Sequence, residues 1–192
     1  MKLYHISHMP NLKEIEPHIS THGKNYVYAI EYLPLGLFFG IRGHGDFDGI
    51  LSGRGKNKEH LPYFSEAYEG ALNLYKGQKC YVYEVDSKYF SQKTSWSEEY
   101  VSEKPVKVLN CRVVEDILSE MEEYEREGKI KLNRYSLDEQ YQTLMNNYLK
   151  ERIEMYGIWK NPKTEIYKFC EEKFPQVLKE VEKTHAVEKM RF

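Results

Sequence analysis

Hydrophobic positions alternate with polar ones in the first part of the chain and recur at helical spacing in the last part. Segments 3–7, 25–30 and 79–87 combine β-branched and aromatic residues with a period of two, which predicts strands. Segment 95–114 predicts one or two further strands. Because the β-rich part comes first and helices follow, the pattern favours the α+β fold class over alternating βαβ units.

After residue 114 the apolar residues form helical stripes. Two stripes, within 114–128 and 137–157, each end at a glycine, which is typical of a helix stop. A third stripe, within 164–183, contains Pro175. Proline lacks the main-chain N–H and clashes with the preceding turn, so this helix is expected to kink or split.

The remaining segments predict shorter elements. Segment 11–21 is expected to be a turn or short helix, and 61–77 a helix that ends at its glycine. Pro34 suits an early position of a short helix. The glycine-rich stretch 42–57 is not expected to be regular structure throughout.

Length and composition suit one globular domain. With 192 residues the chain is long enough to bury a core, and we expect a β-rich core over 1–135 with a helical C-terminal extension over 136–192. The net charge of −2 favours neither nucleic acid nor anionic lipid. Three widely spaced cysteines, no apolar run of membrane-spanning length and no signal-peptide pattern lead us to expect a cytoplasmic protein without a membrane partner.

Polar residues stand at corresponding places in three of the predicted strands. His5 shares a strand face with Ser7, and Tyr28 shares one with Tyr26. Glu99 lies in a later strand. If the strands are neighbours, His5 and Tyr28 are expected to meet on one face, where Glu99 would complete the polar floor of a cleft.

Three segments in this order resemble a known family. "LYHIS" at 3–7, "YVYAIEYLPLGLFFG" at 26–40 and "SEEYVS" at 97–102 are similar to the three motifs of the ADP-ribosyltransferase superfamily. The similarity is to its His-Tyr-Glu branch, which includes diphtheria toxin and the poly(ADP-ribose) polymerases. It covers about residues 1–110 and implies an ADP-ribosyltransferase-like split β-sandwich with flanking helices. One departure is Ile6, which stands where many polymerase-like members have glycine.

The resemblance implies NAD+ as the substrate and assigns roles to the motif residues. Cleavage of the nicotinamide–ribose bond develops oxocarbenium character on the sugar, which a fixed carboxylate stabilises. By resemblance, Glu99 is that carboxylate, while His5 bonds the adenosine-side ribose and Ser7 supports the nicotinamide end. Tyr28 would stack on the nicotinamide ring, with Tyr26 on the same face.

The glycine-rich stretch adds two basic candidates. Arg42 and Arg54 are placed to meet the pyrophosphate of NAD+, and residues 43–57 are expected to border the cleft as a mobile loop. The stretch lacks the lysine and the strand-to-helix context of a phosphate-binding P-loop.

Two other carboxylates compete with Glu99. A slip of one residue in the register of the third motif would favour Glu98. Glu84, in the predicted strand 79–87, is the other rival. We prefer Glu99 because the order Glu-Tyr-apolar matches the third motif.

Alternatives from other classes stay open. Histidine and aspartate residues suggest a metal-dependent enzyme through the sets His5/His8, His18/His22 and His44/Asp46/Asp48. Against a metal, residues three apart on a strand face opposite ways, so no metal is expected. A second alternative is an inactive nucleotide- or protein-binding module of the same fold. An RNA 2′-phosphotransferase ranks lower because no arginine accompanies the first motif.

The resulting expectation is a glycosyltransferase-type enzyme that moves ADP-ribose from NAD+ to an unidentified acceptor and releases nicotinamide. By analogy of fold, such a protein would act as an intracellular toxin or phage-defence effector with a cognate antitoxin or inhibitor protein as partner.

Overall fold

The protein is described by a computed structural model that covers residues 1–19, 24–41, 48–54, 60–92, 94 and 96–189. The chain divides into two compact units. Unit 1 comprises Met1–Asp46, Ser52–Phe64 and Leu72–Asn133, and unit 2 comprises Phe47–Leu51, Ser65–Ala71 and Arg134–Phe192. Two short segments of the first half thus belong with the C-terminal helices, which the sequence pattern does not indicate.

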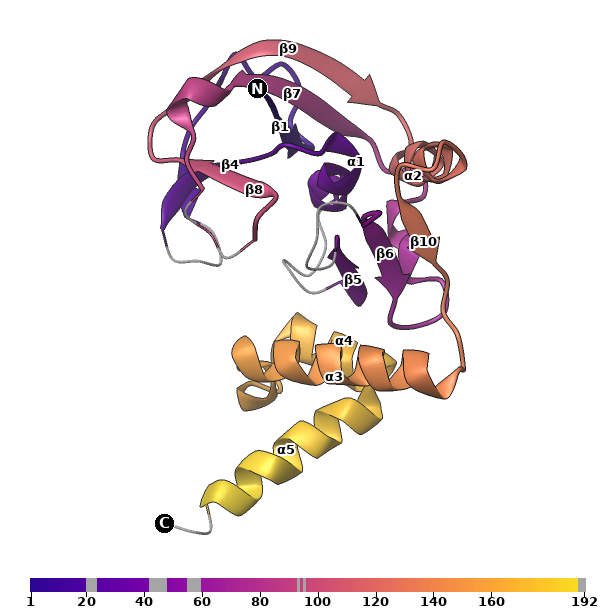
Figure 1. Cartoon of the computed structure of the whole chain (residues 1–192). Helices are drawn as coiled ribbons and strands as arrows, with labels where there is room; N and C mark the ends of the chain where they lie inside the picture. The colour runs from indigo at the N-terminus through magenta and orange to yellow at the C-terminus, as the bar shows by residue number, and fades with distance from the viewer. Residues whose placement is uncertain (20–23, 42–47, 55–59, 93, 95, 190–192) are drawn as a thin grey trace. The chain divides into compact units, whose positions relative to one another are not determined.

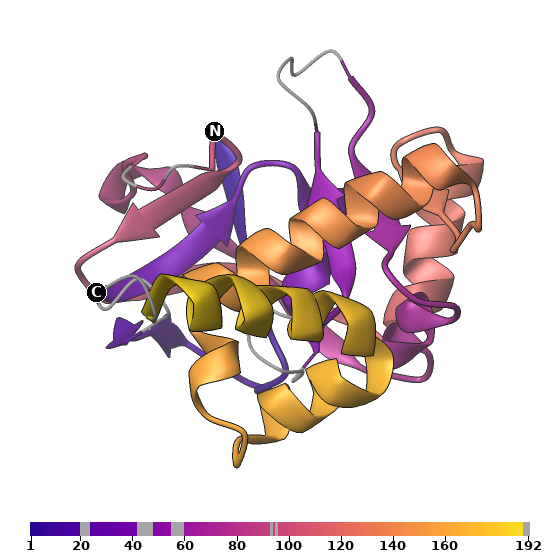
Figure 2. The ribbon, with the colours of Figure 1, turned by 90° about the horizontal axis from the view of Figure 1, so that it is seen from below.

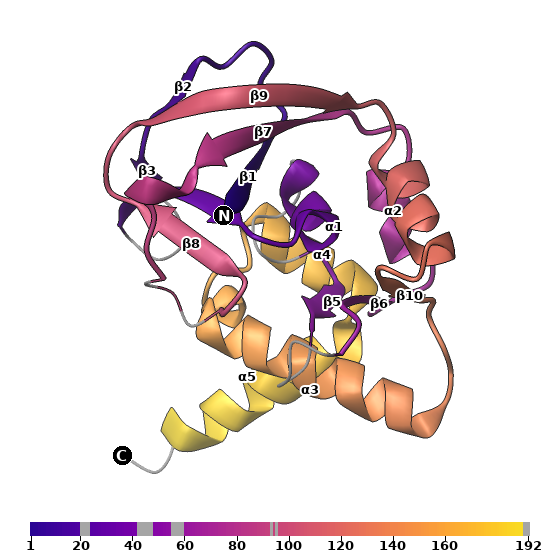
Figure 3. The same cartoon turned by 45° about the horizontal axis from the view of Figure 1, so that its top comes forward.

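Unit 1 is built on a curled antiparallel sheet (Figures 1 and 3). Its order is β2-β9-β7-β1-β4-β3, and β8 also pairs with β4. The strands are β1 (Lys2–Ser7), β2 (Glu14–Ile15), β3 (His18–Ile19), β4 (Asn25–Ile30), β7 (Cys80–Asp86), β8 (Glu99–Ser102) and β9 (Val106–Val114). The four predicted strand regions, 3–7, 25–30, 79–87 and 95–114, are confirmed, the last as the two strands β8 and β9. The turn or helix expected within 11–21 is wrong, because β2 and β3 pair with β9 and β4 there.

A short helix, α1 (Leu33–Gly36), follows β4 and continues into the 3₁₀ helix η1 (Leu37–Gly40). Pro34 stands in its first turn, as predicted. Gly36 permits a close approach to the sheet, since a Cβ there would lie 2.6 Å from Cγ2 of Ile30 and 2.9 Å from Cδ1 of Ile6. The α1 helix therefore packs on the sheet face that carries Ile6 and Ile30.

A smaller sheet has the order β10-β6-β5. Its strands are β5 (Ile50–Gly53), β6 (Tyr63–Glu66) and β10 (Lys131–Asn133), and the division between the units falls within β5 and β6. The helix predicted over 61–77 is wrong. Its first part is β6, beside which Lys131 N donates to Pro62 O at 2.8 Å, and only Ala71–Tyr75 turn helically, as the 3₁₀ helix η2. Cross-strand pairing overrides the local helical pattern here.

The α2 helix (Ile117–Arg126) completes unit 1. Asp116 caps it, since its carboxylate accepts a hydrogen bond from Ser119 N at 3.1 Å. Gly128, just beyond the end, has a φ of 69°, the left-handed conformation expected of a helix stop. The spacing predicts a buried stripe of Ile117, Leu118, Met121 and Tyr124; the first three are buried and Tyr124 is half-buried.

Unit 2 contains α3 (Glu139–Met155), α4 (Glu165–Lys173) and α5 (Pro175–Lys189), which Figure 2 shows from below. Pro175 begins α5, so the predicted split at this proline is confirmed. Asp138 and Thr164 cap α3 and α4. The three helices share one apolar core, whose buried members include Met145, Leu149, Ile153, Cys170, Leu178 and Val181.

The described residues thus form an α+β fold with five α-helices and a curled antiparallel sheet. Within the part of the chain that the structure covers, no helix has the length and apolar character needed to cross a membrane.

Candidate functional site

The three motif strands are direct neighbours in unit 1. The β4 strand pairs with β1 through Tyr4 and Ile30, and with β8 along its length from Val27 opposite Ser102 to Ile30 opposite Glu99. Three segments that are far apart in the sequence therefore form one continuous strip of sheet, β1–β4–β8.

His5 joins the first two motifs through a hydrogen bond. Its ring Nδ1 lies 2.8 Å from the main-chain carbonyl oxygen of Tyr28. A carbonyl only accepts, so Nδ1 carries the proton. Burial lowers the pKa of His5 below its usual value, which favours the neutral ring and leaves Nε2 as a hydrogen-bond acceptor. A ribose hydroxyl is a donor of the kind such a nitrogen accepts.

The register decides which side chains share a face. Residues directly opposite in an antiparallel pair point the same way, so Ile30 and Glu99 share a face, as do Tyr28 and Val101. Alternation joins these two pairs into one surface, and Tyr4, opposite Ile30, extends it onto β1. Tyr28 and Glu99 therefore lie on one face, as expected.

His5 lies on the other face of the sheet. It alternates with Tyr4 and stands opposite Tyr83, with ring centroids 6.5 Å apart. Leu3, on the same side, belongs to a buried cluster with Val27 and Tyr83. The expectation that His5 and Tyr28 meet side chain to side chain is therefore wrong. The two side chains would share a face if His5 stood opposite Tyr28. The observed register of β1 and β4 is shifted by one residue from that pairing.

The carboxylate of the third motif is buried. Glu99 is 8% exposed, and Glu98 and Ser102 beside it are 2% and 1% exposed. Glu99 is thus not a solvated strand carboxylate. A buried carboxylate is costly unless it is compensated, and such groups concentrate at functional sites.

The two rival carboxylates are held in ion pairs. Glu84 lies 3.1 Å from Nζ of Lys2, a surface pair in which the lysine is 68% exposed. Glu98 lies 3.6 Å from Nη1 of Arg54. Both pairings give these carboxylates structural partners within unit 1.

Ser7 and Tyr26 take part in local contacts. Ser7 Oγ accepts a hydrogen bond from Met9 N at 3.1 Å, which shapes the turn after β1. Tyr26 is buried and meets Tyr28 edge to face, with ring centroids 5.8 Å apart. Tyr26 thereby supports the ring that was expected to stack on nicotinamide.

Of the two arginine candidates, Arg42 lies outside the described residues, as do residues 43–47 and 55–57 of the predicted loop. Arg54 follows β5 directly, with its side chain 14% exposed. Its guanidinium carbon lies 4.2 Å above the ring of Tyr32, a cation–π contact. Part of the loop, Ile50–Gly53, is the strand β5.

The metal alternative finds no support among the described residues, in which no group of three or more histidine, cysteine, aspartate or glutamate side chains could hold an ion. His22, His44 and Asp46 of the proposed sets lie outside that part of the chain.

Two further buried carboxylates lie in unit 2: Asp48, which the sequence suggested only as a metal ligand, and Glu66, which the sequence did not single out. Asp48 and Glu66 are each 3% exposed. Glu66 accepts a hydrogen bond from Tyr135 N at 2.9 Å, so it holds the chain that leads into α3. The burial of Glu66 could not be predicted, because the β6 segment that contains it has a helix-like pattern.

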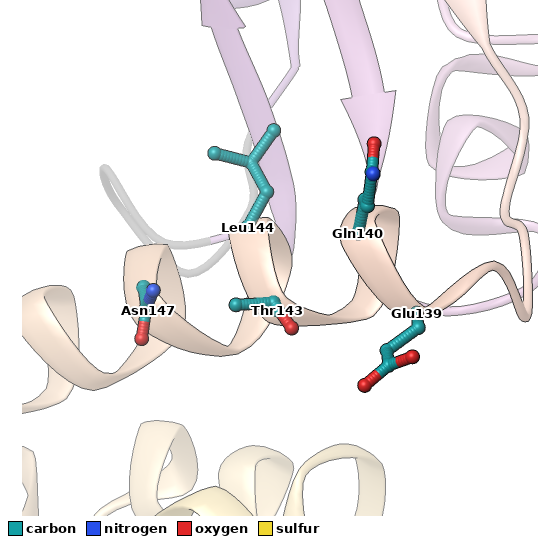
Figure 4. A pocket seen from close by; sticks show the side chains of 5 residues that line it. All are labelled: Glu139, Gln140, Thr143, Leu144 and Asn147. Carbon is teal, nitrogen blue, oxygen red and sulfur yellow. The ribbon is translucent and has the colours of Figure 1, made fainter.

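A pocket lies on the surface of α3, and Figure 4 shows the side chains that line it: Glu139, Gln140, Thr143, Leu144 and Asn147. All five are exposed and come from one helix. The pocket therefore buries no group suited to catalysis.

No protein-family model, curated protein or solved structure matches the chain.

Proposed function

We propose that this protein is an NAD+-dependent ADP-ribosyltransferase with the split β-sandwich of that superfamily. The observation that carries the proposal is the β1–β4–β8 strip, in which three motifs distant in sequence become neighbouring strands in motif order. A chance resemblance of three short segments gives no reason for such adjacency.

In the proposed reaction the bond between ribose C1′ and the nicotinamide nitrogen breaks, and its electron pair leaves with nicotinamide. A nucleophilic atom of the acceptor then bonds to C1′ and loses its proton. Glu99 stabilises the positive charge that develops on the sugar, a contribution of about 100- to 1000-fold in rate. The burial of Glu99 strengthens this electrostatic effect, because water screens it less.

The remaining motif residues bind and orient NAD+. His5 offers the acceptor nitrogen Nε2 to a ribose hydroxyl, while Tyr28 lies on the Glu99 face, where its ring would stack on nicotinamide. β1 and β4 are paired within the sheet, and His5 and Tyr28 lie on its opposite faces, so in this proposal nicotinamide binds on the face of Tyr28 and Glu99. The same proposal includes transfer to an unidentified acceptor, a cytoplasmic location and a cognate inhibitor protein.

Glu99→Gln tests the enzyme. It keeps the side-chain shape and removes the charge, so nicotinamide release should fall by about 100-fold or more while the Kd for NAD+ changes little. Release is measured chromatographically and affinity by calorimetry, with Glu84→Gln as the matched control.

Binding without turnover would instead identify a nucleotide-binding module. NAD+ at 100 times its Kd should stabilise the fold by about 2.7 kcal/mol. Stabilisation of the wild type without nicotinamide release in the presence of protein, nucleic-acid and small-molecule acceptors would replace the enzyme proposal with the binding module.

A further inference from the structure

Arg54, Tyr32 and the buried Glu98 form a cluster at the start of β8. Nη1 of Arg54 lies 3.6 Å from Oε1 of Glu98, and the guanidinium carbon lies 4.2 Å above the Tyr32 ring. The Tyr32 hydroxyl in turn donates to the carbonyl of Lys129 at 2.9 Å. The cluster thus joins the end of β5, the start of α1 and the entry to β8, all within unit 1.

The main chain beside this cluster carries Glu99. The carbonyl of Glu98 accepts a hydrogen bond from Glu31 N at 3.3 Å, which continues the β4–β8 ladder past Ile30. The amide of Glu99 donates to Trp96 O at 3.1 Å. One peptide group therefore separates the anchored side chain of Glu98 from the proposed catalytic carboxylate.

Charge and burial explain why an arginine stands at this place. The Glu98 side chain is 2% exposed, and a carboxylate so buried is strongly destabilising once its cationic partner is removed. The planar guanidinium also packs on the Tyr32 ring, which a lysine ammonium cannot do in the same way. Without Arg54, Glu98 would turn toward water and displace the peptide before Glu99.

We infer that Arg54 is a positioning residue that fixes Glu99 through Glu98. The inference rests on the proposed function for the role of Glu99. It replaces the expectation that Arg54 binds the pyrophosphate, and the two roles predict different outcomes. A pyrophosphate ligand acts on NAD+ affinity and does not depend on the charge of Glu98, whereas a positioning residue acts on turnover and does.

Native-state hydrogen exchange tests the positional part without any turnover. In Arg54→Met, the amides of Glu99 and Glu31 should exchange about tenfold faster than in the wild type, because the β8 entry opens locally. The double variant Arg54→Met/Glu98→Gln removes the stranded charge as well and should recover exchange to within about threefold of the wild type. Arg112→Met is the matched control, since Arg112 pairs with Glu120 elsewhere in unit 1.

Steady-state nicotinamide release tests the consequence for catalysis. In Arg54→Met, kcat should fall about tenfold with KM for NAD+ within about threefold, and the added Glu98→Gln should restore most of kcat. Arg54→Lys keeps the charge and loses the ring contact, so its kcat should lie between those of Arg54→Met and the wild type. A raised KM that Glu98→Gln does not restore would instead make Arg54 a pyrophosphate ligand and overturn the inference.

The two readouts separate the inference from the proposed function. If the wild type releases no nicotinamide, the enzyme proposal fails while the exchange result still decides whether Arg54 holds the Glu99 peptide. If Arg54→Met leaves Glu99 exchange no faster than Arg112→Met does, the positional inference fails, whatever the activity.

Discussion

The β1–β4–β8 strip and the helices of unit 2 bury polar groups in different ways. In the helices two tyrosine hydroxyls have acceptors of their own, since Tyr148 donates to the carbonyl of Ile50 at 3.1 Å and Tyr167 donates to Glu182 at 2.7 Å. At the start of β8 the strip buries the carboxylate of Glu99, and the carboxylate of Glu98 is buried directly before it.

The two kinds of buried polar group have different effects on the stability of the fold. A hydroxyl with one good acceptor is buried at little cost, whereas a buried carboxylate needs charge compensation and seldom repays its desolvation. The helices are thus arranged as a stable core would be. The buried carboxylates Glu98 and Glu99 lower stability unless they are compensated, and under the proposed function Glu99 would act on the substrate.

The largest expected effect tests the structural side of this comparison. Leu149→Ala removes a side chain that is 1% exposed in the helical core, so the free energy of unfolding should fall by about 2–5 kcal/mol. Leu144→Ala on the same helix is the control, because Leu144 is 54% exposed and should change stability by no more than about 0.5 kcal/mol. Urea unfolding measures both.

The helical core and the strip should also differ in activity. Nicotinamide release per folded molecule of Leu149→Ala should match the wild type below its unfolding transition. A loss of release at full folding would show that the helices contribute to the site, and the comparison would then fail.

The second prediction concerns the α1 contact with the strip. Gly36 has a φ of −65°, so alanine brings no backbone strain, and helix propensity alone would favour it. Its Cβ would nevertheless meet Ile30 and Ile6 within 3 Å, and this overpacking should cost about 1–3 kcal/mol.

A double-mutant cycle identifies the clash as the cause. Ile30→Ala removes the nearest methyl, so Gly36→Ala should cost less in that background than in the wild type. Equal costs in both backgrounds would place the strain elsewhere. Since Ile30 stands opposite Glu99, Gly36→Ala should also slow nicotinamide release.

The sequence predicted the helices α2 to α5 better than the strip. Periodicity, glycine stops and Pro175 located α2 to α5 because a helix is set by residues within a few positions of one another. The strands of the strip were found for the same local reason. Their adjacency was an assumption until the pairing of β4 with β1 and β8 was seen.

Register is the feature that local patterns do not contain. Whether His5 stands opposite Tyr28 or is offset by one residue changes its face, although both arrangements have the same alternation. The pairing of Arg54 with Glu98 was equally hidden, since it joins residues from two distant segments. The helix predicted over 61–77 was wrong for a related reason, because β6 in this segment pairs with β10, which lies far along the chain.

The third prediction uses the lowered pKa of His5. Burial favours the neutral ring in the folded state, so the unfolded state binds more protons below the ordinary histidine pKa of about 6.5. Stability should therefore be fully present above that pH and decline as the pH falls toward the folded-state pKa. Urea unfolding between about pH 5 and pH 8 measures this slope.

His5→Asn isolates the contribution of this ring. The asparagine amide can still donate to the Tyr28 carbonyl but does not titrate, so the variant should show a flatter dependence than the wild type in this range. Because the other histidines titrate in both proteins, only the difference between the two curves reports on His5. Identical curves would mean that the His5 ring titrates normally in the folded protein.

The smallest expected effect concerns Glu84, the carboxylate whose partner is solvent-exposed. Its ion pair with Lys2 is exposed on the lysine side, and such pairs contribute about 0–1 kcal/mol. Glu84→Gln should therefore change the free energy of unfolding by less than about 1 kcal/mol. This change should be smaller still at high salt, because salt screens the ion pair. Nicotinamide release should stay within about twofold of the wild type, in contrast to the large loss expected for Glu99→Gln. If Glu84→Gln abolished release while Glu99→Gln did not, the functional carboxylate would lie on β7, and burial on the β1–β4–β8 strip would no longer distinguish the site from the surrounding sheet.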